Sequence, residues 1–144
     1  MGFKIKQLLV EKLPEDTPEF QQFPGMIAEL KRDFAVPSAC FIMAYDDRSA
    51  QKIIGVGGIR DMGGYSCEVK RLVVWWDFQK MGVGRQLLEM LIKQAVIRGY
   101  RKMRVQVPTS VPALVRFYQK MGFAEVPPFR ICSPEEFVFM ELAL

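Results

Sequence analysis

Histidine is missing from this sequence of 144 residues. Nucleophile pairs that depend on imidazole are therefore excluded, and so are most zinc sites, because histidine is the usual base in the former and a common ligand in the latter. Any proton transfer must use Asp, Glu, Tyr, Lys or Cys side chains. We expect no metal site.

Cysteine is scarce, and Cys40, Cys67 and Cys132 are widely spaced and odd in number. Neither a disulfide framework nor a paired-cysteine metal knuckle fits this spacing, so three reduced thiols are expected. No apolar secretory segment opens the sequence, and no apolar run reaches the roughly 18 residues of a membrane helix. These absences predict a cytoplasmic protein with no membrane partner.

Runs of basic residues are also lacking, although the net charge is +4. The Lys and Arg residues are scattered, unlike those of nucleic-acid-binding tails, so no nucleic-acid partner is expected. Half of the residues are hydrophobic, which is enough for one core in a chain of this length. With no linker or repeat in view, residues 1–144 are predicted to form a single domain.

Segments typical of strands and of helices alternate along the chain. Apolar or alternating runs predict strands at residues 3–10, 39–45, 53–60, 65–75, 102–107, 123–126 and 137–142. Helices are predicted at residues 26–34, 84–98 and 114–120, the last preceded by Pro112. This order predicts an α/β fold with a mixed sheet and helices on both faces.

The long strand at residues 65–75 is predicted to alternate strictly between two faces. Lys70, Leu72 and Val74 would lie on one face, and Val69, Arg71 and Val73 on the other.

The stretch QKMGVGRQ, residues 79–86, places two glycines directly before the long amphipathic helix. A dinucleotide fingerprint would require glycine where Leu87 stands, and no Lys-Ser or Lys-Thr pair follows either glycine as in a P-loop. What remains is a strand, a Q-x-x-G-x-G loop and a helix, at which backbone N–H groups and the positive end of the helix dipole converge. This pattern favours a pyrophosphate site, with a plain tight turn as the alternative.

Two further motifs flank this loop: EVKRLVV at residues 68–74 and PALVRFYQKMGF at residues 112–123. Together the three motifs resemble the GNAT superfamily of acetyl-CoA-dependent N-acetyltransferases, and the order of elements does so over nearly the whole chain. The resemblance implies a mixed, mostly antiparallel, splayed sheet of about six or seven strands with helices on both faces. It also implies direct transfer of an acetyl group to a primary amine of a small molecule or peptide, with acetyl-CoA as donor and no metal.

The resemblance also implies where acetyl-CoA would bind. The strand that ends at Val74 would present its backbone to the pantetheine arm, and the glycines would let the main chain approach the pyrophosphate. Because Val111 replaces an asparagine common in the family, Ser110 or Thr109 is the expected substitute. The expected cofactor-binding residues are Leu72, Val73, Val74, Gln79, Lys80, Met81, Gly82, Val83, Gly84, Arg85, Ser110 and Tyr118.

Glu68 and Tyr118 are the expected catalytic residues. An alkylamine with a pKa of about 10.4 is mostly protonated at neutral pH, so a base must take a proton before the nitrogen attacks the thioester. Glu68 resembles the strand glutamate that some members use for this, usually through water; an ion pair with a neighbouring Lys or Arg is the alternative. Tyr118 matches the family's tyrosine and would protonate the departing thiolate, whereas a satisfied helix aromatic is the alternative. A main-chain N–H near Val74 would stabilise the oxyanion.

Several questions stay open at this level. A non-catalytic acyl-CoA-binding sensor or interaction module of the same fold is the alternative to the enzyme. An acyl-cysteine route through Cys67 is disfavoured, since no histidine could activate the thiol. The acceptor has no readable code: Trp75 and Trp76 are interpreted as packing residues, although one of them could line its site. Dimers are common in the family, so a homodimer also stays open.

Overall fold

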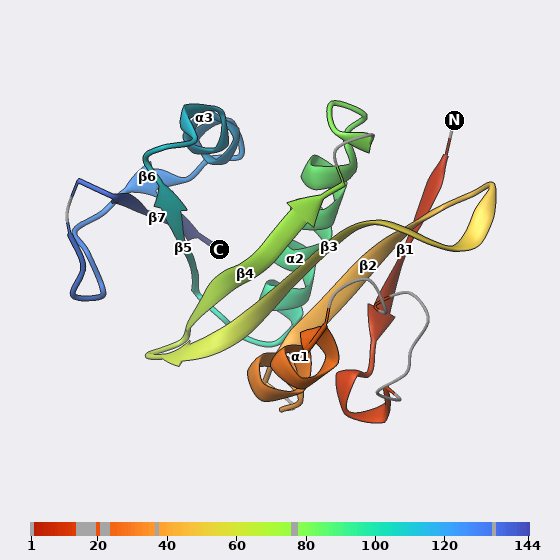
Figure 1. Cartoon of the computed structure of the whole chain (residues 1–144). Coiled ribbons are helices and arrows are strands. Elements are labelled where there is room, and N and C mark those ends of the chain that lie inside the picture. Colours follow the sequence, from red (N-terminus) through yellow and green to blue (C-terminus); the bar gives the residue numbers. More distant parts are fainter. Residues whose placement is uncertain (1, 14–19, 21–23, 37, 76–77, 134) are drawn as a thin grey trace.

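A computed structural model describes residues 2–13, 20, 24–36, 38–75, 78–133 and 135–144 of the chain. In these parts seven strands form one sheet in the order β1-β2-β3-β4-β5-β7-β6, with β4 and β5 parallel and every other pair antiparallel (Figure 1). The strands are β1 (Phe3–Leu8), β2 (Cys40–Asp46), β3 (Ser49–Gly63), β4 (Ser66–Val74), β5 (Lys102–Pro108), β6 (Ala124–Glu125) and β7 (Phe137–Ala143). The predicted fold class, a mixed and mostly antiparallel sheet, is confirmed.

Three α-helices occur in the same parts of the chain, and all three were predicted to within two residues at each end. They are α1 (Met26–Phe34), α2 (Val83–Ile97) and α3 (Pro112–Lys120), and a short 3-10 turn, η1, covers Val10–Lys12. Pro112 occupies the first helical position of α3, which its fixed φ favours. No helix among the described residues is both long and apolar enough to cross a membrane.

The helices α1 and α2 cover opposite faces of the sheet (Figure 1). Two adjacent glycines in β3 show this most directly. A Cβ atom on Gly57 would lie 3.2 Å from a methyl group of Leu91 in α2, whereas one on Gly58 would overlap the ring of Phe34 in α1. Each helix therefore approaches the sheet over a position that has no side chain.

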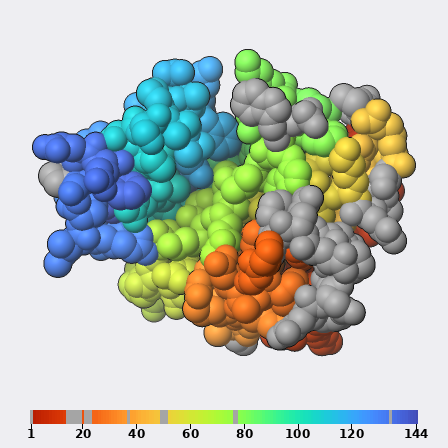
Figure 2. All heavy atoms as spheres, viewed as in Figure 1, coloured from red at the N-terminus to blue at the C-terminus, as the bar shows by residue number. Residues whose placement is uncertain are grey.

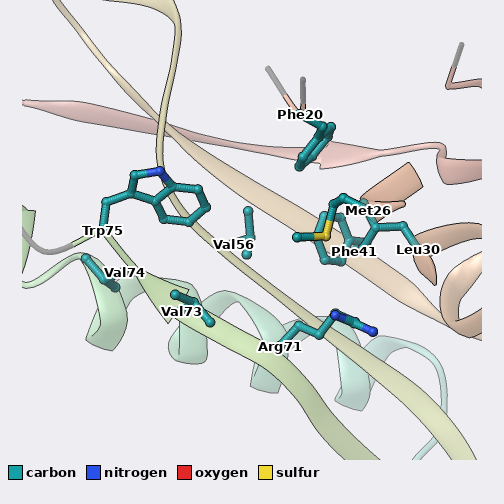
Figure 3. Close-up of a pocket in the computed structure, with 9 residues that line it drawn as sticks. All are labelled: Phe20, Met26, Leu30, Phe41, Val56, Arg71, Val73, Val74 and Trp75. Atoms are coloured by element: carbon teal, nitrogen blue, oxygen red, sulfur yellow. The ribbon is translucent and has the colours of Figure 1, made fainter. Parts of the chain in front are cut away.

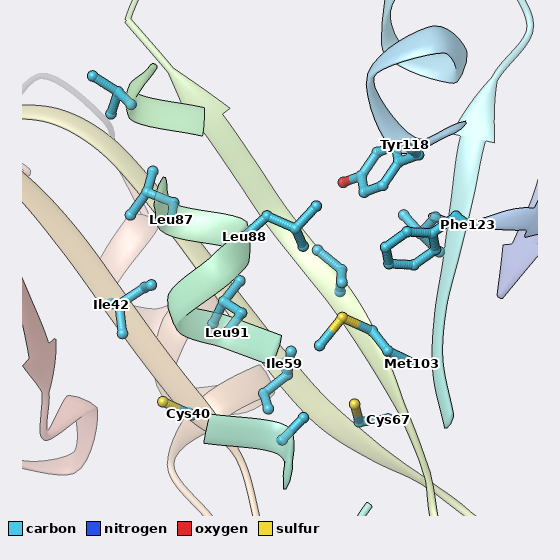
Figure 4. Packing of buried hydrophobic residues seen from close by; sticks show 14 of the residues in the cluster. Cys40, Ile42, Ile59, Cys67, Leu87, Leu88, Leu91, Met103, Tyr118 and Phe123 are labelled. Atoms are coloured by element: carbon cyan, nitrogen blue, oxygen red, sulfur yellow. The ribbon is translucent and has the colours of Figure 1, made fainter. Parts of the chain in front are cut away.

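Two clusters of buried side chains follow from this arrangement. The larger lies under α2, where Leu87, Leu88 and Leu91 are fully buried (Figure 4). The smaller lies under α1 and includes Leu30 and Phe41. The long helix expected to be amphipathic therefore does pack one apolar side on the sheet.

The parallel strands β4 and β5 stay paired for only three residues. Ser66, Cys67 and Glu68 of β4 pair with Lys102, Met103 and Arg104 of β5. Beyond Glu68 the two strands diverge, and α3 lies near the far end of β5 (Figure 1). The sheet is therefore splayed between β4 and β5.

A β-bulge interrupts β4 beyond this point. Val73 pairs with Val56 and Lys70 pairs with Gly58, so β4 carries one residue more than β3 between these pairs. Arg71 lies in this interval with a φ of 57°, in the left-handed region. The extra residue changes which way the following side chains point.

The strict alternation predicted for this strand is therefore wrong across the bulge. Leu72 lies beside Gly57 with Leu91, on the face covered by α2. Val73 lies opposite Val56, which belongs to the cluster under α1. Leu72 and Lys70 thus point to opposite faces.

Candidate active site

The loop before α2 has the backbone of an anion-binding site. Gly82 caps the helix with a φ of 82°, and Lys80 is also in the left-handed region with a φ of 65°. The N–H of Gln86 donates to the carbonyl of Gly82 at 3.1 Å as the first helical hydrogen bond. The N–H groups of residues 83–85 therefore have no partner within the helix, and they point to the same end as its positive dipole. This end of α2 suits a phosphate.

A cavity of about 610 Å³ runs from this loop to the end of β4 and to α3. In Figure 2 a notch separates the atoms of α3 from those of the loop before α2. The predicted cofactor residues that line the cavity are Leu72, Val73, Val74, Gln79, Lys80, Gly82, Gly84 and Arg85. Met81, Val83, Ser110 and Tyr118, which the structure also describes, lie outside this lining.

Gln79 ties the loop to the end of β4. Its side-chain nitrogen Nε2 donates to the carbonyl oxygen of Val74 at 3.1 Å. The loop and the splayed strand are therefore held together at the wall of the cavity.

Further lining residues were missed by the sequence analysis. These are Phe78, Val111, Ala113, Leu114 and Phe117. Ala113, Leu114 and Phe117 mark one face of α3 by their helical spacing, but the same spacing also describes a helix face packed on a core.

Tyr118 lies on α3 and is only 3% exposed. Its ring makes edge contacts with Phe117 and Phe123, each at a centroid distance of 5.2 Å. Figure 4 shows its hydroxyl group directed toward β4. Burial raises the pKa of Tyr118 well above its usual value, so the phenol holds its proton at any physiological pH.

Glu68 is a buried carboxylate, 1% exposed, at the last paired position before β4 and β5 diverge. Both of its oxygens accept hydrogen bonds from the guanidinium group of Arg130. Arg60 Nε and Lys70 Nζ each lie 3.9 Å from its Oε1 atom. An ion pair is therefore present, although its main partner is far away in the sequence. The role of Glu68 as a base stays a prediction.

Arg130 is held on several sides in the segment between β6 and β7. Its Nη1 atom also donates to Oε1 of Gln106 at 3.0 Å, and its guanidinium lies 5.4 Å from the ring centroid of Phe129. The hydrogen bonds to Glu68 raise the pKa of Arg130, against the opposing effect of burial. Glu68 thus anchors a loop that lies on the same face of the sheet as α1.

Arg71 links the bulge in β4 to α1. Its Nη1 atom lies 3.1 Å from Glu29 Oε2, and its Nη2 and Nε atoms lie 3.3 and 3.4 Å from Asp33 Oδ2. A left-handed conformation costs a residue with a Cβ atom about 1–2 kcal/mol. The contacts with α1 offset this cost, and no local pattern in the sequence could have indicated them.

Replacing Arg71 tests this account of the bulge. Arg71→Ala is expected to lower the free energy of unfolding by about 1–2 kcal/mol, because it removes the ion pairs with Glu29 and Asp33 that offset the strained φ, while the strain itself remains. Arg71→Gly should cost less, since glycine adopts this φ freely. Urea unfolding measures both changes, provided that the dependence of the unfolding free energy on urea concentration is the same in each variant.

The control for this experiment is Arg85→Ala. Arg85 also pairs with a carboxylate, Glu89, at 2.9 Å, but both side chains are mostly exposed. Its loss should cost only about 0.3–0.5 kcal/mol. An Arg71→Gly variant as unstable as Arg71→Ala would show that the left-handed backbone adds no strain.

A second cavity, of about 370 Å³, opens on the face covered by α1 (Figure 3). It is lined by Phe20, Met26, Leu30, Phe41, Val56, Arg71, Val73, Val74 and Trp75. Val73 and Val74 also line the first cavity, so both cavities reach the end of β4. Trp75 contributes to this wall, whereas Trp76 lies outside the described residues.

The cysteine and metal chemistry of the described residues is limited. Cys67 is fully buried, and burial raises its pKa to about 12, so it remains a protonated thiol and a poor nucleophile. No group of three or more metal-ligating side chains occurs within the part of the chain that the structure describes.

The splayed sheet, the glycine loop at the N-terminus of α2 and the cavity beside them are the features that the resemblance to acetyltransferases led us to expect. Residues 37–125 of this chain match the protein-family model of the acetyltransferase (GNAT) domain. The chain belongs to the GNAT acetyltransferase family, and it is an acyltransferase enzyme.

Individual relatives agree with this assignment. The chain is 31% identical to the IAA acetyltransferase of Azospirillum brasilense over an alignment of 113 residues. This alignment covers 76% of the chain and 71% of that protein. It is 25% identical over 143 residues to an uncharacterised N-acetyltransferase of Schizosaccharomyces pombe, covering 97% of this chain and 86% of the other. A crystal structure of a GNAT family acetyltransferase from Elizabethkingia anophelis with acetyl-CoA bound has the same fold, with a TM-score of 0.72 at 19% identity over 99% of this chain and 98% of that one.

Proposed function

We propose that this enzyme transfers the acetyl group of acetyl-CoA directly to a primary amine within a ternary complex. The observation that carries the proposal is that both cavities are lined by Val73 and Val74 at the end of β4. One cavity reaches the N-terminus of α2, and the other opens on the face covered by α1. Donor and acceptor could therefore reach the end of β4 together from two sides.

The donor would bind in the larger cavity. Its pyrophosphate would contact the N–H groups of residues 83–85, with the positive charges of Lys80 and Arg85 nearby. Its pantetheine arm would lie along the backbone of residues 72–74. Met81 and Val83 would contribute through their main chains, and Ser110 would lie at the start of α3. The acetyl-CoA bound in the Elizabethkingia anophelis relative supports this choice of donor.

The transfer itself requires two proton movements. The amine nitrogen attacks the thioester carbonyl, the new C–N bond forms, and the C–S bond breaks as the oxyanion collapses. Glu68, which lines neither cavity and precedes Val73 by five residues on β4, would take the proton that the amine loses through a chain of water molecules, and Tyr118 would give one to the departing thiolate. A main-chain N–H near Val74 would stabilise the oxyanion. Buried, protonated Cys67 supports direct transfer over an acyl-enzyme.

The kinetic order tests the ternary complex. Initial rates of thiol release are measured with acetyl-CoA and amine varied together. Direct transfer predicts double-reciprocal lines that intersect, whereas an acyl-enzyme predicts parallel lines. Parallel lines would therefore overturn the proposal of direct transfer.

Tyr118→Phe tests the proposed acid. The variant should lose about 10²-fold or more in kcat, which is the usual contribution of a positioned acid, while the KM for acetyl-CoA changes little. Because burial holds the pKa of Tyr118 well above its usual value, the wild-type rate should show no alkaline decline due to this residue up to about pH 10. Steady-state thiol release between pH 6 and 10 measures both effects.

The matched control is Tyr100→Phe. The hydroxyl group of Tyr100 donates to the carbonyl of Ser38 at 2.8 Å. Tyr100 follows the C-terminal end of α2, whereas Tyr118 is next to Phe117 of the donor cavity. Removal of the Tyr100 hydroxyl group should leave kcat within about twofold, since the chemistry does not touch it. A Tyr118→Phe enzyme with unchanged turnover at every pH would show that Tyr118 is a packing residue.

We also propose that residues 1–144 act as one domain in the cytoplasm. One sheet joins β1 to β7, which supports a single unit. Cys40, Cys67 and Cys132 are all unpaired, which supports a reducing compartment.

A further inference from the structure

The described lining of the cavity under α1 is apolar except for Arg71. Met26 and Leu30 of α1 line one end, Phe41 and Val56 line the floor, and Trp75 lines the other end (Figure 3). Among the described residues that line it, Arg71 alone carries a charge. An apolar cavity of this kind discriminates ligands by the surface they bury.

The charge of Arg71 is already neutralised. Asp33 and Glu29 of α1 hold its guanidinium group, with the closest contact at 3.1 Å to Glu29. Figure 3 shows the guanidinium directed away from Trp75. Within its described lining, the cavity therefore offers no unpaired cation to a carboxylate or phosphate. It also has no acidic side chain in its described lining to receive a second ammonium group.

From this we infer that the acceptor is a primary amine carried on a compact apolar body, an arylalkylamine or branched alkylamine with no further charge. The inference rests on the proposed function, since it takes the cavity under α1 as the acceptor side. The amine nitrogen would lie at Val73 and Val74, where the donor cavity begins. The apolar body would extend over Val56 toward Met26 and Leu30.

Size and charge both disfavour large polycationic acceptors. A volume of about 370 Å³ is at the small end of ligand pockets, which span about 300–1,000 Å³, and it suits one ring on a short chain. Polyamines and aminoglycosides carry several ammonium groups, and burying an unpaired charge is strongly unfavourable. These compounds should therefore be poor acceptors.

A panel of amines tests the inference with acetyl-CoA held at saturation and free thiol as the readout. The panel is propylamine, 2-phenylethylamine, 1,5-diaminopentane, spermidine and kanamycin. We expect kcat/KM for 2-phenylethylamine to exceed that for propylamine by about tenfold or more, because the additional apolar surface is buried. Spermidine and kanamycin should fall below propylamine. A preference for either polycation would overturn the inference.

A substitution in the cavity wall sharpens the test. Met26 occupies the first position of α1, where a glutamate is compatible with the helix dipole and with folding. Met26→Glu should lower kcat/KM for 2-phenylethylamine by about tenfold through KM, and should raise that for 1,5-diaminopentane, because the new carboxylate can pair with a second ammonium group. The KM for acetyl-CoA should not change.

Met90→Glu is the control variant for this experiment. It makes the same change on α2, at a residue that lines neither of these two cavities, and it should leave the order of amines as in the wild type. An unchanged order in Met26→Glu would also overturn the inference.

The panel separates a wrong acceptor from a wrong function. If acetyl-CoA binds but none of the amines releases thiol, the proposed function fails, and the inference fails with it. If thiol is released most efficiently with a polyamine or aminoglycoside, the proposed function stands and the acceptor class alone is wrong.

Discussion

Gly84→Ala is expected to weaken acetyl-CoA binding by about tenfold or more, equivalent to about 1.4 kcal/mol, while the protein stays at least as stable as the wild type. A Cβ atom at this position would lie 3.5 Å from Val74 Cγ2 and 3.8 Å from Phe117 Cζ. These are ordinary contacts, so the free protein can accommodate the methyl group. Alanine also favours a helix over glycine by up to about 1 kcal/mol.

The methyl group would, however, occupy the wall of the donor cavity. Val74 and Phe117 both line this cavity, so the new Cβ atom projects between the end of β4 and α3. The main chain of Gly84 is also where a phosphate would approach the helix N-terminus. Calorimetric titration with acetyl-CoA and urea unfolding of the same variant separate the two effects.

A different result is expected for alanine at Gly82, because the backbone conformation there differs from that of Gly84. The φ of 82° at Gly82 strains any residue with a Cβ atom, although no atom lies within 4 Å of the position that the Cβ would take. Gly82→Ala should therefore lose both stability and affinity. Gly99 has a similar φ of 87° and an equally open surrounding at the other end of α2. Gly99→Ala should lose stability alone, which makes it the matched control. Unchanged acetyl-CoA affinity in Gly84→Ala would show that the loop is a simple turn and does not bind the donor.

The sequence predicted those features that short segments determine. The loop at residues 79–86 and helix α2 depend on glycine positions and apolar periodicity, which are local. The splayed sheet followed from the family resemblance. The wall of the donor cavity on α3 was not predicted, because apolar residues at helical spacing do not show whether they face a core or a cavity. Phe117 shows that ambiguity.

The features that the sequence did not predict depend on distant contacts. Arg71 adopts a conformation typical of glycine because Asp33, in another element, holds its side chain. Glu68 finds its main partner in Arg130, 62 residues away. No propensity or spacing encodes such pairs, since they exist only once α1 and the segment between β6 and β7 have packed on the sheet.

Glu68→Gln is expected to lower kcat/KM for the amine by about 10²-fold or more near pH 7, and the loss should shrink as pH rises toward about 10. The amine loses its own proton as pH approaches its pKa of about 10.4, so the need for a base disappears there. Below that pKa, the free amine increases tenfold per pH unit, and kcat/KM of the variant should rise with it. The wild type should depend less on pH.

The ion pair with Arg130 is compatible with this role. An ionised carboxylate has about four acceptor positions, and the two hydrogen bonds from Arg130 use two of them. A water molecule can therefore still donate to Glu68 and form the last link of a water chain that relays a proton from the amine. Glutamine keeps the size and one acceptor oxygen, so the variant is expected to fold, which its unfolding transition would verify.

Glu141→Gln separates a base from a structural anchor. Glu141 pairs with Glu68's neighbour Arg104 at 2.8 Å and with Lys102 at 3.8 Å, so this variant removes a comparable ion pair from the same sheet. Its rate should fall little, and by the same factor at every pH. If Glu68→Gln shows that same constant factor, Glu68 acts by fixing Arg130 and the loop over the acceptor face. The amine would then lose its proton to solvent before it binds, and kcat/KM of the wild type would itself rise tenfold per pH unit below about 10.4.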